Sequence, residues 1–178
     1  AALSYIQSTK VGGRESEGLA QQEIAADFVE SMLPNIIYFM GSGQTVAGIM
    51  ATLGLPNTLL GVDVICNDAV LQHDVTSLDL QHWTTQGRCR IVVTVIGGQG
   101  HVFGRGNQQF SPEVIRAVGL AAIDVVATKT KLEALSSALV IVDTGDQDLD
   151  EALSGVHRIR TGYNDAVLMR WGTQDLGG

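Results

Sequence analysis

The chain has 178 residues, enough for one ordinary domain with its own hydrophobic core. Hydrophobic residues make up 45% of the chain and charged residues 17%, a composition that excludes an intrinsically disordered protein. The formal net charge of -8 argues against a general nucleic-acid or membrane-surface role, because phosphate backbones and anionic lipids repel an acidic surface.

Cysteine spacing and hydropathy both favour a cytoplasmic protein. Cys66 and Cys89 lie in no Cys-x-x-Cys or Cys/His spacing, so we expect buried free thiols rather than a zinc site or a disulfide. The sequence has no apolar run of about 18 residues and no signal-peptide pattern, and we therefore expect a cytoplasmic protein. The chain starts with Ala1 rather than Met, from which we expect a fragment of a longer protein.

Strand-like and helix-like patterns alternate along the chain. In the first half of the chain we expect strands at residues 3–8, 36–40 and 58–65, helices at 17–33, 46–53 and 79–85, and turns at 41–45 and at Asn67 and Asp68. In the second half we expect strands at 90–96, 122–127 and 138–142, a loop at 97–109, and a C-terminal hairpin at 157–163 and 166–171. The helices expected there are one at 111–118 with Ser111 as its N-cap and Pro112 in its first turn, one with Lys131 in its first turn, and a short one capped by Asp146.

This order predicts an α/β fold: a mostly parallel sheet with helices on both faces, glycine-rich loops at the carboxyl ends of the strands, and a C-terminal β-hairpin. We expect residues 1–172 to form a single α/β domain and residues 173–178 to form a flexible tail. Because parallel strands place their carboxyl ends at one edge of the sheet, the loops that follow them are expected to form one ligand site.

The stretch at residues 97–109, GGQGHVFGRGNQQ, is the strongest candidate for that site. Its glycines, which leave backbone N–H groups open to an anion, are Gly97, Gly98, Gly100, Gly104 and Gly106. Arg105 adds a permanent positive charge, and Asn107 and Gln108 add amides that both donate and accept hydrogen bonds. These features predict a loop that binds a small phosphorylated ligand; a flexible loop whose polar groups cap one another would have the same composition.

The turn at residues 41–45, GSGQT, has the pattern of a second phosphate loop. Gly41, Ser42, Gly43 and Thr45 are its candidate ligand contacts, at the start of a helix whose dipole attracts an anion. Glycines also let a helix turn tightly off a strand for packing alone, so both interpretations stay open at this turn.

Charged residues at strand ends complete the candidate site. Lys129 would offset phosphate charge, whereas Lys131 is either solvated or faces an anion, because a cation in a first turn opposes the helix dipole. Asp143 and Asp63 are the candidate catalytic carboxylates, able to hold Mg2+ or to accept a ribose hydroxyl, and Asp143 is the candidate metal ligand. His101 is the one histidine in a candidate loop, where a structural role is the more common one.

Several runs together resemble one protein family. GGQGHVFGRGNQQFSPEVIRAVG, VVATKTKLEAL, VDTGD, LDEALSG and TGY are similar to the carboxyl-terminal part of the predicted ATP-NAD kinase family that includes the acetoin-catabolism X protein. QSTKVGG, YFMGSGQT and LLGVDVI resemble the middle region of that family, although Ser42 and Gln44 depart from its usual GPGTT-like loop. The resemblance implies ATP and NAD as substrates and Mg2+ as the metal.

The family's GGDGT motif belongs to an amino-terminal domain and does not occur in this chain. The resemblance therefore implies a missing amino-terminal domain as a partner, and a chain that does not complete phosphoryl transfer alone. Two other functions stay open: a phosphosugar- or CoA-type ligand site of an isomerase-like or effector-sensing domain, and a structural domain, with a homodimer compatible with the apolar composition.

Overall fold

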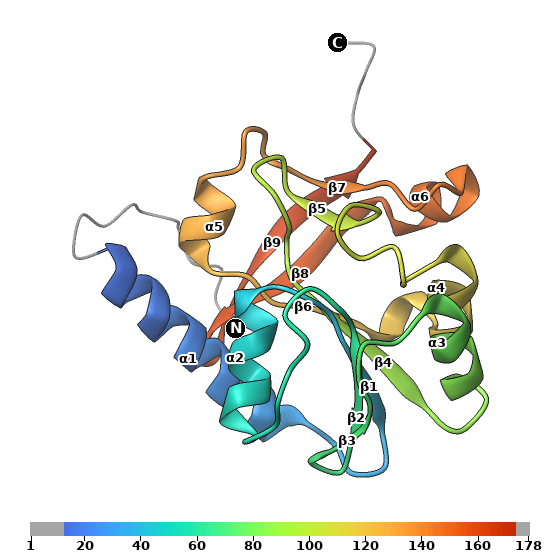
Figure 1. Ribbon diagram of the computed structural model, residues 1–178. Coiled ribbons are helices and arrows are strands. Elements are labelled where there is room, and N and C mark those ends of the chain that lie inside the picture. The colour runs from blue at the N-terminus through green and yellow to red at the C-terminus, as the bar shows by residue number, and fades with distance from the viewer. Residues whose placement is uncertain (1–12, 174–178) are drawn as a thin grey trace.

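The structure, a computed structural model that describes residues 13–173, contains two β-sheets with helices packed around them (Figure 1). The five-stranded sheet has the order β3-β2-β1-β4-β6, and the four-stranded sheet has the order β5-β7-β9-β8. The strand predicted at residues 3–8 and the predicted tail beyond residue 173 lie outside the described residues. The single-domain assignment of residues 1–172 therefore stays a prediction.

The five-stranded sheet is mixed. Its strands are β1 (Ile37–Met40), β2 (Asp63–Cys66), β3 (Ala69–Gln72), β4 (Cys89–Val93) and β6 (Ile123–Val125). The central strand β1 runs parallel to β4 and antiparallel to β2, β4 runs parallel to β6, and β3 pairs antiparallel with β2 at one edge. Residue 40 of β1 pairs with residue 63 of β2, so the end of β1 and the start of β2 lie at the same edge of the sheet.

The four-stranded sheet is also mixed. It contains β5 (His101–Phe103), β7 (Leu139–Val142), β8 (Gly155–Gly162) and β9 (Asp165–Gly172). β7 runs parallel to both β5 and β9, whereas β8 and β9 form an antiparallel hairpin. That hairpin confirms the predicted C-terminal hairpin, with the turn at Tyr163 and Asn164.

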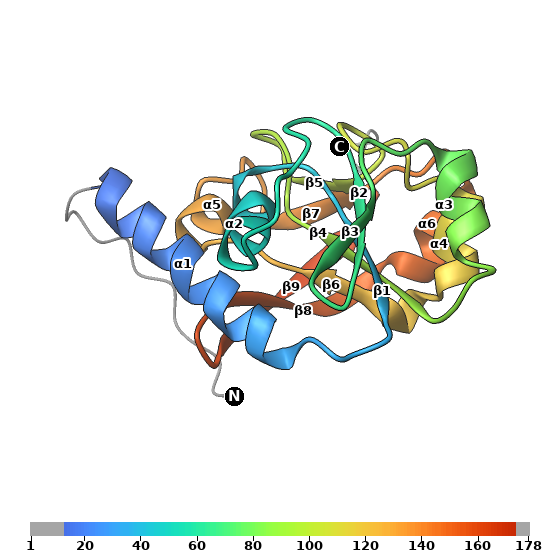
Figure 2. The same cartoon turned by 60° about the horizontal axis from the view of Figure 1, so that its bottom comes forward.

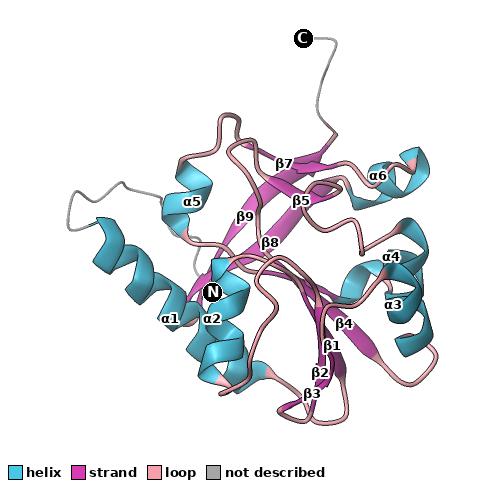
Figure 3. Ribbon diagram, viewed as in Figure 1, coloured by secondary structure: helices cyan, strands magenta, loops and turns pink. Residues whose placement is uncertain are grey.

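Helices lie on both sides of the five-stranded sheet (Figures 2 and 3). The helices of the described part of the chain are α1 (Gly13–Ser31), α2 (Gln44–Thr52), α3 (Ser77–Trp83), α4 (Pro112–Val118), a 3-10 turn (Leu120–Ala122), α5 (Lys129–Glu133) and α6 (Gln147–Leu153). None of the helices within residues 13–173 combines the length and the apolar character needed to cross a membrane.

Alternate residues of β1 point into two different hydrophobic clusters. Ile37 and Phe39 belong to a cluster that also includes side chains of α3, α4 and the four-stranded sheet, whereas Tyr38 and Met40 pack with α1 and α2. All four side chains are buried. Because both faces of the strand are covered, it is apolar without the polar alternation of a half-exposed strand, as the sequence indicated.

The prediction of a mostly parallel sheet was wrong. Asn67 and Asp68 both have positive φ angles, 50° and 60°, and form the two-residue turn of a β-hairpin between β2 and β3. The predicted strand at 58–65 is accordingly shorter and starts at Asp63, and β3 was missed. The predicted loop at 97–109 also contains a short strand, β5, which pairs with β7 in the second sheet.

The local capping predictions were correct. The Ser111 hydroxyl accepts a hydrogen bond from the Val114 N–H at the start of α4, with Pro112 as the first helical residue. The Asp146 carboxylate accepts one from the Leu149 N–H at the start of α6. Each side chain thus satisfies a donor that has no partner within its own helix.

Both cysteines are free, but they differ in exposure: Cys89 is buried and Cys66 is half-buried. Burial, with a smaller contribution from the neighbouring Cys66, raises the pKa of the Cys89 thiol to about 11. We expect iodoacetamide to label Cys89 about 100-fold more slowly than an exposed cysteine near neutral pH, because only the thiolate reacts. Peptide mass spectrometry over a time course measures this rate, and equal labelling of Cys89 and an unfolded control would contradict the expectation.

Candidate functional site

The turn between β1 and α2 presents an uncapped helix start. Gly43 is the N-cap of α2, with a φ of 105°, and it forms no side-chain capping bond. A Cβ atom at Gly43 would lie 2.6 Å from the methyl group of Thr94, so the close approach of the two segments requires glycine. The first backbone N–H groups of a helix have no intrahelical acceptor, and no side chain of the turn caps them here.

This helix start borders a cavity of about 270 Å³. Four segments contribute its walls, and the lining residues are Glu17 and Gln21 of α1, Gly43, Gln44 and Thr45 at the start of α2, residues 94–97 after β4, and Lys131 of α5. Parts of the two glycine-bearing segments that the sequence singled out therefore meet around one cavity.

Lys131 is held at this cavity by two hydrogen bonds. Its Nζ atom donates to the Gly97 carbonyl oxygen at 3.0 Å, and its backbone N–H donates to the hydroxyl of Thr128, the N-cap of α5, at 3.1 Å. Lys131 thus borders a cavity, and its role in facing an anion stays a prediction.

Lys129, which we predicted to offset phosphate charge, points elsewhere. Its Nζ atom forms an ion pair with the Asp165 carboxylate of the C-terminal hairpin at 2.7 Å, and it does not line the cavity. Residues two positions apart in a helix are separated by about 200° around its axis, which explains why Lys129 and Lys131 point to opposite sides of α5.

The first part of the 97–109 stretch is a tight turn rather than an open loop. Ile96 and His101 exchange two backbone hydrogen bonds of 2.7 and 2.8 Å, and the Gly100 N–H donates to the Gly97 carbonyl. A Cβ atom at Gly100 would lie 2.8 Å from the Leu135 side chain, so this glycine serves close packing. Gly97 lines the cavity, whereas Gly98 and Gly100 do not.

The second part of the stretch is stabilised by hydrogen bonds of its own side chains. The buried Asn107 side chain donates to the Val102 carbonyl at 2.8 Å and accepts from the Gly104 N–H at 3.3 Å. The Ser42 hydroxyl donates to the Gly106 carbonyl at 3.4 Å, which joins this part to the GSGQT turn. Residues 74–77 with Gly106, Gln108 and Gln109 form a second, open hollow of about 640 Å³. Arg105 is exposed and lines neither this hollow nor the cavity.

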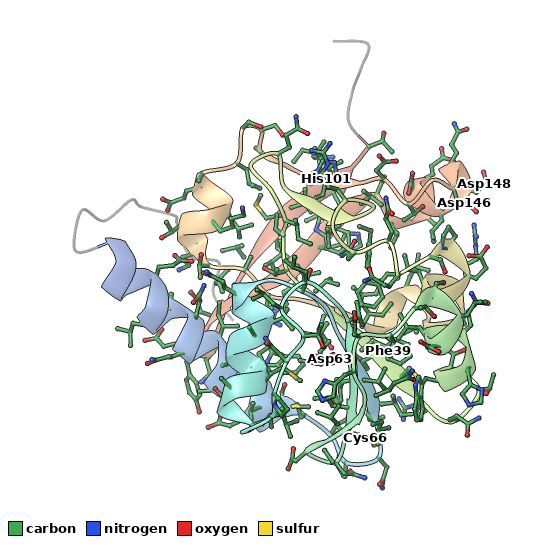
Figure 4. All side chains as sticks on the ribbon, viewed as in Figure 1. Phe39, Asp63, Cys66, His101, Asp146 and Asp148 are labelled. Carbon is green, nitrogen blue, oxygen red and sulfur yellow. The ribbon has the colours of Figure 1, made fainter. Side chains whose placement is uncertain are left out.

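Asp63 is only 2% exposed and organises the loop around β2 (Figure 4). Its carboxylate accepts hydrogen bonds from the Thr58 N–H and hydroxyl, both at 2.7 Å, and from the Asp74 N–H at 2.9 Å. Burial alone would raise the pKa of this carboxyl, but these hydrogen bonds, helped by the charge of nearby His73, hold the pKa below its usual value. Asp63 lines neither hollow, and its bonds are those of a structural residue.

Asp143 is exposed at the end of β7, on the other sheet, and does not line the cavity. Its N–H donates to the Phe103 carbonyl at 3.1 Å. Within residues 13–173, no three His, Cys, Asp or Glu side chains come together in a way that could hold a metal ion. The described residues therefore do not form a dedicated Mg2+ centre, and the role of Asp143 as a metal ligand stays a prediction.

His101 lies on β5, well away from Asp63 (Figure 4). It is 6% exposed, and its Nδ1 atom has no hydrogen-bond partner in the described part of the chain. Burial and, to a lesser degree, the Arg105 charge lower the pKa of this imidazole, while Asp143 acts in the opposite sense. His101 lines neither hollow, which agrees with a structural role.

Sequence reasoning missed six cavity residues, of which four have polar side chains: Glu17, Gln21, Gln44 and Thr94. Glu17 and Gln21 lie within the predicted helix at 17–33, and Thr94 lies within the predicted strand at 90–96, so none of them had the pattern of a ligand loop. Glu17 and Gln21 line the cavity because α1 packs beside α2, a contact that no local pattern specifies.

Residues 33–171 match the family described as the ATP-NAD kinase C-terminal domain. Comparison with curated proteins and with solved structures gave no significant match. The matched range covers the α2 start, the 94–97 segment and Lys131, but not Glu17 or Gln21. Since the match extends over most of the chain, the protein belongs to the ATP-NAD kinase family, whose C-terminal domain it carries.

Proposed function

We propose that the cavity at the start of α2 binds a phosphate group of the nucleotide substrate in an ATP-dependent, NAD kinase-like phosphotransferase. The observation that carries the proposal is the meeting of an uncapped helix start at Gly43 with the Lys131 ammonium group around one cavity. Free backbone N–H groups, the positive end of a helix dipole and a lysine are the features that stabilise a phosphate in proteins.

The size of the cavity suggests that it holds only part of the ligand. Its volume of about 270 Å³ lies below the range of about 300 to 1,000 Å³ that is typical for a drug-sized molecule. Ser42 precedes the cavity residue Gly43 and donates a hydrogen bond to Gly106, which lines the second hollow. We propose that a long ligand such as NAD or ATP extends from the cavity toward this hollow, where the Gln108 amide binds a base.

The proposal assigns binding, and not the chemical step, to this chain. Asp63 and Asp143, the carboxylates that the sequence suggested as catalytic, do not line the cavity. The family resemblance implies that a separate amino-terminal domain contributes the GGDGT motif, and we propose that this domain supplies the catalytic acid and any Mg2+ site. A homodimer stays a prediction.

A pair of lysine variants tests the phosphate site. We expect Lys131→Met to weaken the binding of pyrophosphate, ATP and NAD about tenfold in isothermal titration calorimetry, because it removes the charge that faces the cavity. Lys129→Met removes the same charge two residues away, where the ammonium group pairs with Asp165, and should leave each dissociation constant within about twofold.

Three results would argue against this assignment. Equal losses in the two lysine variants would mean that net charge and not position matters. Binding of sugar phosphates or coenzyme A in preference to NAD and ATP would favour the isomerase-like or sensing function. Failure of the unmodified chain to bind any of these ligands would overturn the phosphate site itself.

A further inference from the structure

Glu17 lines one wall of the same cavity and has a buried carboxylate oxygen without a hydrogen-bond partner among the described residues. It lies near the beginning of α1, and its residue lines the cavity together with Gly43 and Lys131. Its Oε1 atom accepts a hydrogen bond of 2.7 Å from the Thr128 hydroxyl. Its Oε2 atom is buried and has no hydrogen-bond partner among the described residues. A buried carboxylate oxygen in a protein normally accepts a hydrogen bond, and the Oε2 atom of Glu17 lacks a donor of this kind among the described residues.

The same network keeps Glu17 and Lys131 from neutralising each other. Thr128 donates its hydroxyl proton to Glu17 and accepts the Lys131 N–H, which fixes the start of α5 against α1. The Lys131 ammonium group instead donates to the Gly97 carbonyl, and no ion pair of 4 Å or less between Glu17 and Lys131 occurs in the described structure. An acceptor and a cation therefore border one cavity at separate positions.

We propose that Glu17 accepts hydrogen bonds from the ribose hydroxyls of a nucleotide whose phosphate lies at Lys131 and the start of α2. The inference rests on the proposed phosphate site and adds the other end of the ligand. A hydroxyl group is a suitable donor to a carboxylate, and acidic side chains bind ribose hydroxyls in nucleotide sites of other folds. Glu17 precedes the range matched by the family, so the match itself does not cover this residue.

Two features of the site favour a hydroxyl donor over a metal ion. Within residues 13–173 no further Asp, Glu, His or Cys side chains gather beside Glu17 to complete a metal site. The Oε2 atom is buried beside the cavity, so a ligand reaches it only when the Glu17 side chain shifts. A hydroxyl donor then needs no further protein ligands around this oxygen, whereas a metal ion would need them.

Glu17→Gln tests the contact with little change in shape. The glutamine carbonyl still accepts from Thr128, while its amide places two N–H donors where Oε2 lies. We would titrate the complete 178-residue chain with pyrophosphate, ADP and 2′,3′-dideoxy-ADP. We expect the unmodified chain to bind ADP about tenfold more tightly than dideoxy-ADP, and Glu17→Gln to reduce this ratio to about one. Pyrophosphate should bind Glu17→Gln at least as tightly, because an anion is removed from the cavity.

Glu23→Gln is the matched control, because it removes the same charge from an exposed position of α1 that does not line the cavity. The ratio of ADP to dideoxy-ADP affinity should be unchanged in this variant. A Glu17→Gln protein that keeps the full ratio, or an unmodified chain that shows none, overturns the role of Glu17 and leaves the phosphate site intact. Equal losses for pyrophosphate and ADP in Glu17→Gln would make Glu17 a structural residue and also overturn it. If the unmodified chain binds neither pyrophosphate nor ADP, the phosphate site and this inference both fail.

Discussion

Gly104→Ala is expected to lower the free energy of unfolding by about 4 kcal/mol, which is a large part of the stability of an ordinary domain. The φ angle at Gly104 is 107°, where residues with a side chain are strained. A Cβ atom there would also clash with the Asp143 carbonyl oxygen, which is backbone and cannot rotate away. The substitution therefore separates the ends of β5 and β7.

Gly119→Ala provides the control for this measurement. Gly119 has a similar φ of 100°, but no atom lies within 4 Å of the position a Cβ would take. It should carry the conformational cost alone, about 2 kcal/mol. Urea unfolding followed by circular dichroism gives both values. If the two variants lose the same stability, the close approach of Gly104 to Asp143 does not exist in solution.

Asp63→Asn is expected to cost about 3 kcal/mol at neutral pH. The carboxylate accepts three hydrogen bonds from Thr58 and Asp74 in a buried position, and an asparagine amide would direct its own N–H groups at one of these donors. Asp68→Asn is the matched control, because it removes the same charge from an exposed turn where asparagine tolerates a positive φ. We expect that control to lie within about 0.5 kcal/mol of the unmodified chain.

The stability difference between the unmodified chain and Asp63→Asn should depend on pH in a defined direction. The pKa of Asp63 is lowered in the folded state, so the folded state binds this proton less readily than the unfolded state does. The contribution of Asp63 is then complete above the unfolded pKa of about 4, and it is lost as the pH falls through the lower folded pKa. A difference that stayed constant from pH 7 down to pH 3 would contradict a charge-dependent role.

The residues around the cavity show which features of a site can be predicted from the local sequence. The GSGQT turn was found because a strand, a glycine turn and a helix follow one another directly in the sequence, and Gly43 does border the cavity. Lys129 was preferred over Lys131 because it was expected at the carboxyl end of the strand, whereas a cation at Lys131 opposes the helix dipole. The choice depended on which side of α5 faces the cavity, and only the packing of α5 against α1 and the turn after β4 determines that orientation.

The sequence by itself determined what depends on neighbours along the chain. These features are the α/β class, the buried strand β1 with α2 behind it, the caps Ser111 and Asp146, and the C-terminal hairpin, all of which follow from hydrophobic periodicity, capping and turn chemistry. Apart from that hairpin, tertiary structure alone decided which strands pair, in which direction, and in which of the two sheets. It also brought Glu17 to Thr128, 111 positions later, and thereby to the cavity of Lys131. Such contacts arise from the joint packing of several elements, and no local pattern of residues encodes them.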